Sequence, residues 1–185
     1  MKLEELIKGR RSIQLYENKE VDIPLLKELL ETAIWVPNHK MTQPWRFVFV
    51  HGKGKEKIAE LNKRLSAKGT TEEEKNRSGE KAYQKMIDVP MYLMVLMEES
   101  PDLKLRQEDY AATSCVIQNF SLLAWEQGIG MIWKTGPMTT TEAFRSIIGA
   151  QNGEKVVGML QIGYPAKVTK PRPRIDIQNR IEEIY

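Results

Sequence analysis

Cysteine and histidine are scarce in this chain. Among 185 residues there are one cysteine, Cys115, and two histidines. A single cysteine excludes an internal disulfide and a CxxC metal or redox pair. Neither histidine stands in an HExxH or similar spacing, so no metal site is expected. The sequence also holds no Ser-His-Asp or Cys-His arrangement that supports nucleophilic catalysis, and no side chain is assigned a catalytic role.

Long hydrophobic runs are absent as well. No apolar stretch approaches the ~18 residues of a membrane span, and the N-terminus has no apolar region typical of a signal peptide. The net charge is only +3, with basic and acidic residues interspersed, so no nucleic-acid-binding stripe emerges. A 41% hydrophobic content in 185 residues predicts one domain, residues 1–185, in the cytoplasm, with no membrane or nucleic-acid partner.

Residues 33–50 carry the first informative motif. A helical segment ends at Pro37, a polar loop follows, and Gln43-Pro44-Trp45 leads into a β-rich run. Pro44 forces its predecessor out of the helical region and cannot donate a ladder hydrogen bond, so the loop is expected to be rigid there. The side chains left free to face a ligand are His39, Lys40 and Gln43. Taken alone, an ordinary helix-to-strand connection explains the same pattern.

A second motif, Arg10-Arg11-Ser12, follows a short amphipathic stretch and Gly9. Two guanidiniums beside a hydroxyl form a donor cluster suited to a phosphate, because arginine presents a planar fork that matches tetrahedral oxygens. Adjacent arginines are also common on solvated surfaces, so this pair is ambiguous by itself.

Together the two motifs resemble the flavin-dependent nitroreductase family. Chains of that family open with an Arg-x-Ser phosphate-binding segment and place a loop ending in Gln-Pro-Trp over the flavin. The long segment 106–127, followed by Gly128 and a Gly-rich turn, is similar to the family's central helix and flavin-contacting strand end. Lys170-Pro171-Arg172 resembles its second phosphate clamp. The resemblance covers essentially the whole chain and is most like the compact, single-domain branch.

The resemblance implies an α+β fold of three α/β/α layers, with a mainly antiparallel central sheet flanked by helices. The coarse hydrophobic pattern agrees with it. Helices are expected at about 2–8, 23–35, 55–67, 78–87, 103–127 and 140–148, and strands at 46–50, 91–97, 130–133 and 156–163. Residues 91–97 are apolar on both alternating sets, as in a central strand covered on both faces.

Three local features are also predicted. The highly charged segment 66–81 is expected to be a mobile surface excursion. Thr139 and Glu142 have the spacing of a capping box for the last helix. Gly128 is interpreted as a helix C-cap.

The apolar residues of segment 106–127 wrap most of the way round a helix, which must then be buried on nearly every face. Small residues at 111, 112, 114 and 115 would let a second helix approach. One domain could bury such a helix centrally, but the family uses it as the core of a homodimer. The stretch 170–185 fits an arm that crosses onto the partner subunit.

FMN as cofactor, NAD(P)H as reductant and a small-molecule oxidant, such as a nitroaromatic or quinone, are implied by the resemblance, with ping-pong hydride transfer. The implied cofactor-binding residues are Arg10, Arg11, Ser12, Gln14, Trp35, His39, Met41, Trp133, Lys134, Thr135, Lys170 and Arg172. The implied nicotinamide-binding residues are Leu123, Ala124, Trp125, Glu126, Gln127 and Gly128. Trp35 and His39 would come from the partner subunit, although His39 could equally be a solvated loop residue.

Two positions depart from the family pattern. Gln14 stands where many members carry Arg or Lys, and Met41 stands where many carry Asn. Both changes remove polar contacts to the flavin ring. The physiological substrate, the choice between NADH and NADPH, the flavin potential and the oxygen sensitivity of turnover therefore stay open. The alternatives are a flavin enzyme of the same family with a non-nitro substrate, and a non-catalytic flavin-binding or storage protein.

Overall fold

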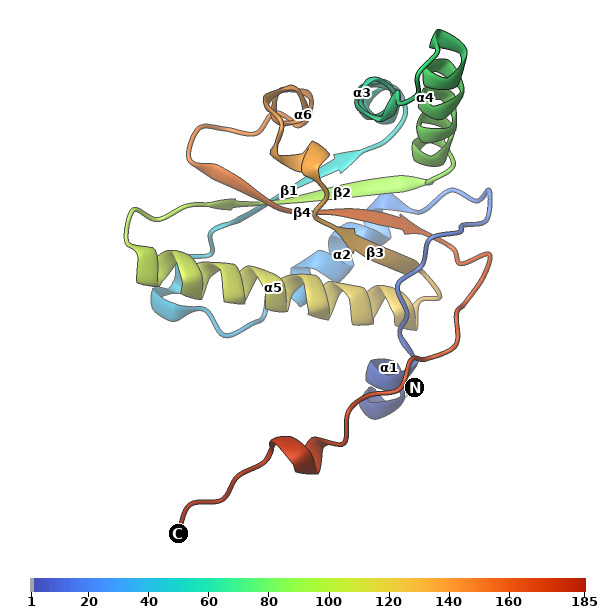
Figure 1. Cartoon of the computed structure of the whole chain (residues 1–185). Helices are drawn as coiled ribbons and strands as arrows, with labels where there is room; N and C mark the ends of the chain where they lie inside the picture. Colours follow the sequence, from blue (N-terminus) through green and yellow to red (C-terminus); the bar gives the residue numbers. More distant parts are fainter. Residues whose placement is uncertain (1) are drawn as a thin grey trace.

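In the computed structural model, which describes residues 2–185, a four-stranded antiparallel sheet is covered by helices on both faces (Figure 1). The strands are β1 (Trp45–Val50), β2 (Met91–Glu98), β3 (Gly130–Lys134) and β4 (Glu154–Gly163), in the spatial order β1-β2-β4-β3. The helices are α1 (Leu3–Gly9), α2 (Ile23–Ala33), α3 (Lys53–Ser66), α4 (Glu72–Ile87), α5 (Leu103–Glu126) and α6 (Glu142–Ile148), with 3-10 turns η1 (His39–Met41), η2 (Pro137–Thr140) and η3 (Ile177–Arg180). The expected three-layer α+β fold is confirmed.

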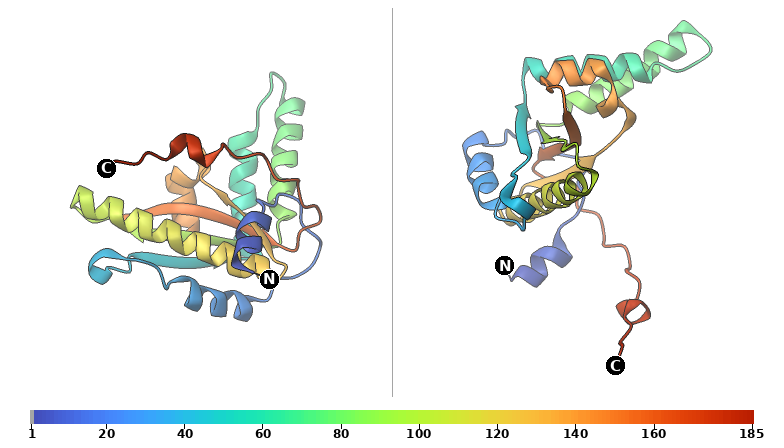
Figure 2. Two further views of the ribbon diagram at one scale, coloured as in Figure 1. Left: turned by 90° about the horizontal axis from the view of Figure 1, so that it is seen from below. Right: turned by 90° about the vertical axis from the view of Figure 1, so that its left-hand side faces the viewer.

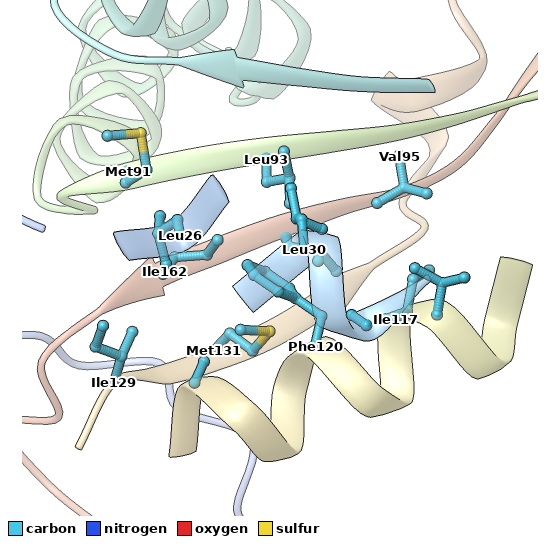
Figure 3. Close-up of a cluster of buried hydrophobic side chains, with 14 of the residues drawn as sticks. Leu26, Leu30, Met91, Leu93, Val95, Ile117, Phe120, Ile129, Met131 and Ile162 are labelled. Atoms are coloured by element: carbon cyan, nitrogen blue, oxygen red, sulfur yellow. The ribbon is translucent and has the colours of Figure 1, made fainter. Parts of the chain in front are cut away.

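Strand β2 lies in the interior of the sheet and separates two hydrophobic cores. Its side chains alternate between the faces, as the two-residue period of a strand requires. Met91, Leu93 and Val95 pack with α2 and α5 in one core, whose labelled members include Phe120 (Figure 3). Tyr92, Met94 and Leu96 pack with α3, α4 and α6 in the other core. The two-sided apolar pattern of residues 91–97 therefore predicted a central strand correctly.

Helix α5 is buried on one face only within the chain. Its inward residues include Val116 and Phe120, which are fully buried. Ala112 is 3% exposed and packs inside the chain, so its expected place on a surface for a second helix is wrong. Its neighbours Ala111 and Cys115 are exposed. A second helix would therefore have to pack against the exposed side of α5 that carries Ala111 and Cys115.

The charged segment 66–81 is not an irregular excursion, because α4 begins at Glu72. Thr71 caps the helix: its hydroxyl accepts a hydrogen bond from the Glu74 amide at 3.2 Å, and the Glu74 carboxylate accepts one from the Thr71 amide. Gly79 is buried against α3, where an added Cβ would lie 3.2 Å from Lys63. The charges mark the solvated sides of a helical hairpin rather than a mobile loop.

The expected capping box at Thr139 and Glu142 is wrong. The N-cap of α6 is Thr141, whose hydroxyl accepts from the Phe144 amide at 3.2 Å. Thr139 instead belongs to η2, where its hydroxyl donates to the Gly136 carbonyl at 2.8 Å. A short 3-10 turn between the strand and the helix displaced the cap by two residues.

No helix among residues 2–185 combines the length and the apolar character needed to cross a membrane.

Arg46 on β1 and Glu154 at the start of β4 form a bidentate ion pair. Arg46 Nε and Nη2 each lie 2.6 Å from a Glu154 carboxylate oxygen, and the Gln151 amide donates to the same carboxylate at 2.7 Å. The hydrogen bonds from Arg46 lower the pKa of Glu154 below its ordinary value. The Glu154 side chain is only 9% exposed, whereas the Arg46 side chain is 36% exposed, so the carboxylate is the shielded partner of the pair.

Replacing this carboxylate by the amide in Glu154→Gln is expected to lower the free energy of unfolding by about 1.5–3 kcal/mol at neutral pH. A depressed folded-state pKa contributes stability above the ordinary glutamate pKa of about 4.3, and that contribution is lost as pH falls through the folded-state value. Urea unfolding at several pH values measures it. The exposed Glu72→Gln, which breaks a pair with Lys75 and removes one charge from the acidic first turn of α4, should cost at most about 1 kcal/mol. A deficit in Glu154→Gln that stays constant into strong acid would contradict the ion-pair explanation.

Candidate functional site

The chain after α1 runs along the ends of β3 and β4. In residues 10–16, the Ile13 amide donates to the Met131 carbonyl at 3.1 Å. The Ala166 amide donates to the Leu15 carbonyl at 3.0 Å. The N-terminal motif and the segment after β4, which are about 150 residues apart in sequence, are thereby joined side by side.

Two glycines permit this close approach. An added Cβ at Gly130 would collide with the side chain of Ile13, and one at Gly163 would lie 2.7 Å from the Tyr16 ring. Any larger side chain at either position would push the N-terminal segment away from the sheet. Backbone packing therefore decides where the Arg10-Arg11-Ser12 motif lies.

A cleft of about 1740 Å³ follows this junction and is strongly basic. Its walls come from residues 10–23, the α3–α4 hairpin and residues 167–174 of the C-terminal arm. Ten lining residues are Lys or Arg: Arg10, Arg11, Lys19, Lys55, Lys85, Lys134, Lys167, Lys170, Arg172 and Arg174. Three are acidic: Glu17, Glu20 and Asp88. Since the whole chain carries only +3, its positive charge is concentrated here, and the cleft is suited to an anionic ligand.

Arg10 lies at the densest part of this charge. Partial burial lowers the pKa of its guanidinium, and the nearby cations Arg11 and Arg174 lower it further. The Arg11 side chain is held in place by donating to the Lys8 carbonyl at 2.6 Å and to the Arg10 carbonyl at 2.7 Å. A cluster of cations that destabilise one another is relieved by a bound anion, which makes this the best candidate for a phosphate site.

Arg174 is a member of the cluster that sequence reasoning missed. Its Nη1 donates to the Arg172 carbonyl at 3.0 Å, and its charge acts on Arg10. A signal for it exists in the sequence, where Lys170, Arg172 and Arg174 alternate with prolines. Alternate residues of an extended chain point to the same side, so Arg174 is expected on the same side as Lys170 and Arg172.

The structure brings most of the implied phosphate-side residues into one cleft. Ser12, Gln14 and Lys134 line it together with the arginines and Lys170. Trp133 does not line the cleft; its Nε1 donates to the Val157 carbonyl of β4 at 3.0 Å and its ring covers Gly158. Thr135 is exposed just after β3 and does not line the cleft.

The remaining implied flavin residues lie elsewhere. Trp35 is 85% exposed just after α2, where the Ala33 carbonyl accepts a hydrogen bond from Asn119 Nδ2 of α5 at 3.3 Å. Met41 is 68% exposed in η1, the turn beside the N-terminal half of α5. His39 Nε2 lies 3.9 Å from a carboxylate oxygen of Glu108. The Arg10 cluster lies at the other end of α5, where a Cβ on the adjacent Gly9 would be 3.7 Å from the Trp125 ring.

Glu108 and Trp125 are 17 positions apart on α5, which is about 25 Å at a rise of about 1.5 Å per residue. One chain therefore does not bring the His39–Met41 turn and the Arg10 cluster together.

The implied nicotinamide segment, residues 123–128, forms the C-terminal end of α5. Gly128 has φ +73°, its amide donates to the Trp125 carbonyl at 3.0 Å, and the Ile129 amide donates to the Ala124 carbonyl at 2.9 Å. This is a Schellman arrangement in which Gln127 is the C-cap and Gly128 is the left-handed residue after it, so Gly128 ends the helix as expected, one residue beyond the C-cap itself. The Ala124 side chain is fully buried, Leu123 and Trp125 are half-buried, and Glu126, Gln127 and Gly128 are exposed. None of the six lines the basic cleft.

Comparison with known proteins adds a family relationship to this geometry. The model of the Nitroreductase family matches residues 7–164. The chain is 35% identical over 185 residues to the "Putative NAD(P)H nitroreductase YfhC" of Bacillus subtilis (strain 168), covering 98% of this chain and 94% of that one. It is 28% identical over 163 residues to a similarly described protein, YdjA, of Escherichia coli (strain K12), covering 87% of each.

Solved structures agree with the sequence relatives. A nitroreductase-like family protein from Bacillus cereus has 38% identity and a TM-score of 0.87, covering 100% of this chain and 96% of that one. The FMN and NADPH-dependent nitroreductase NfnB has 17% identity and a TM-score of 0.78, and covers 100% of both chains. The similarity to NfnB concerns the fold alone.

Proposed function

This chain belongs to the nitroreductase family, and from that premise we propose that it is an FMN-dependent NAD(P)H oxidoreductase. Its acceptors would be nitroaromatics, quinones or similar small molecules. The names of its relatives from Bacillus subtilis and Escherichia coli support this assignment, since both describe NAD(P)H nitroreductases. The observation that carries the proposal is the basic cleft around Arg10.

The residues of the cleft fit the phosphate of FMN. The charged groups that shift the pKa of Arg10 are both cations, so the cluster has positive charge to offer an incoming dianion. Arg11, Arg172 and Arg174 add planar donor forks, and Ser12 adds a hydroxyl. These side chains would hold the phosphate, and the cleft would orient the cofactor from that end.

When bound, FMN supplies the hydride and electron transfer, so the side chains bind, orient and exclude water. Gln14 and Lys134 line the cleft beyond the arginine cluster. The Gln14 amide offers a donor and an acceptor without charge, whereas Lys134 offers a cation. The Trp133 indole does not line the cleft, but it is fixed near the end of β3 by its hydrogen bond to the Val157 carbonyl of β4.

A complete site requires a second copy of the chain. The His39–Met41 turn and the Arg10 cluster occupy opposite ends of α5, so two chains with antiparallel α5 helices would bring the turn of one subunit to the arginines of the other. Exposed apolar side chains mark the surface that such a homodimer would cover. They are Leu3, Ile7, Trp35, Leu103, Ile175, Ile177, Ile181 and Ile184.

The C-terminal arm supports the same arrangement. Every residue from 167 to 185 is exposed, and the arm runs away from the domain (Figure 2). Four isoleucines on a segment without a core of its own are costly to leave in water. We therefore propose that the arms are exchanged between subunits and packed onto the partner.

The visible absorption spectrum of the purified protein tests the proposal. A bound flavin should be present, and anaerobic addition of NADH or NADPH should bleach it, followed by recovery when a quinone is added. Flavin that is bound but never bleached would instead indicate a flavin-binding or storage protein. A colourless protein that fails to take up added FMN would contradict the assignment.

A further inference from the structure

The loop that precedes β1 is strained at three positions. Lys40, Met41 and Gln43 have φ values of +56°, +52° and +45°, although none of them is glycine. Side chains with a Cβ rarely adopt this left-handed region, and the surrounding structure must impose it. Such strain is concentrated in segments whose geometry matters for binding or catalysis.

Asn38 and Thr42 hold the loop closed through their side chains. The Asn38 carbonyl oxygen Oδ1 accepts from the Gln43 amide at 2.7 Å. Asn38 Nδ2 donates to Thr42 Oγ1 at 2.9 Å. The Thr42 hydroxyl has one proton, and it is directed to Asp109 Oδ1 at 2.5 Å. The Thr42–Asp109 bond thereby connects these local bonds to α5, to which His39 is also close through Glu108 at 3.9 Å.

Asp109 is an unusual residue for the inner face of α5. It is 2% exposed, and its neighbours on that face are Ala112, Thr113 and Val116. Burial of a carboxylate is costly unless the group is paired or hydrogen-bonded, and the Thr42 hydroxyl supplies such a bond. An apolar side chain at this position would pack without the cost of burying a carboxylate. We therefore attribute the carboxylate to its hydrogen bond with Thr42.

We propose that Asp109 is a positioning residue for the reaction. By accepting the Thr42 hydroxyl, it keeps the strained loop in one conformation and so fixes where His39 and Met41 project. This inference rests on the proposed function, in which that loop faces the flavin of the partner subunit. Loss of the bond would let the loop relax from its left-handed conformation. Small acceptors would then bind beside a less ordered loop, and their affinity would fall.

The test compares Thr42→Val, which keeps the branched shape and removes the hydroxyl, with Thr42→Ser, which keeps the hydroxyl. Amide hydrogen exchange of peptides covering residues 38–43 is the first measurement and needs no flavin. Exchange in Thr42→Val should be about ten-fold faster or more, the change expected for loss of a hydrogen bond to a charged group. Thr42→Ser should stay within about two-fold of wild type.

A double-mutant cycle separates this contact from general destabilisation. Asp109→Ala should accelerate exchange of the same loop, and the double variant should show no further acceleration beyond the larger single effect. Thr140→Val, which removes a hydroxyl donating to the Pro137 carbonyl in η2, is the matched control and should leave the loop unchanged.

Steady-state kinetics with 1,4-benzoquinone provide the second measurement. In Thr42→Val the KM for the quinone should rise at least several-fold, with full flavin content, and Thr42→Ser should restore it. Unchanged loop exchange in Thr42→Val, or a Thr42→Ser variant that behaves like it, would overturn the inference. A flavin-free wild type would overturn the proposed function instead, and the absorption spectrum detects that separately.

Discussion

Arg10→Ala should weaken FMN binding about ten-fold or more, because a charge-assisted hydrogen bond to the phosphate contributes roughly 1.5–3 kcal/mol. The same change should not destabilise the flavin-free chain, since the guanidinium is crowded there by Arg11 and Arg174. Fluorescence titration of the apoprotein with FMN measures the affinity, and thermal unfolding of the apoprotein measures stability. A fall in affinity without a fall in stability is the signature of a ligand-binding arginine.

Riboflavin, which has no phosphate, provides the internal control. Its weaker binding should be the same in wild type and Arg10→Ala, because the deleted side chain has nothing to contact. Arg77→Ala removes an exposed arginine from α4 outside the cleft and should leave both affinities unchanged. Purification of Arg10→Ala with full flavin and an unchanged dissociation constant would rule out the phosphate assignment.

Ala111→Arg should convert a dimer into monomers and release FMN. Ala111 is exposed within the chain, on the same side of α5 as Cys115, where we propose that the partner helix packs. An arginine there would be buried without a partner in the assembled protein, which is costly. Obligate homodimer interfaces commonly bury about 2,000–5,000 Å² or more, so a charge at their centre disrupts a large surface. Light scattering and flavin content measure the two consequences.

Two further variants make this result specific. Asn76→Arg adds the same charge to an exposed position of α4 and should leave the dimer intact. Ala112→Arg should unfold the chain itself, since Ala112 is 3% exposed in the subunit core. A wild-type monomer that retains tightly bound FMN would contradict both the interface and the shared site.

Some of the candidate site could be predicted from the sequence because its parts are local. Arg10-Arg11-Ser12 is ambiguous alone and suggests a phosphate site together with the Gln43-Pro44-Trp45 loop, and the structure places the arginines and the serine in a basic cleft. The contribution of Arg174 was missed because only one Lys-x-Arg pair was considered in residues 170–174. The helix predicted at 78–87 was shorter than α4, because the charge of the preceding residues was interpreted as a sign of mobility. Thr71 and Glu74 carry the local capping signal that marks the true start.

The sequence by itself determined the properties that depend on a residue and its near neighbours. Residues 91–97 are apolar at every position, and a strand of that kind must be covered on both faces. Gly128 ends α5 because the left-handed backbone there suits a residue without Cβ. These choices follow from steric limits and solvation, which are already present in a short segment.

Only the tertiary structure decided which distant groups meet. The arm arginines reach Arg10 because residues 10–16 pair with the ends of β3 and β4, and no local preference favours bringing like charges together. The Thr42–Asp109 bond likewise joins residues 67 positions apart. Contacts of this kind depend on how helices and strands pack against each other, because the free energy that holds them together comes from the whole core rather than from the residues that touch.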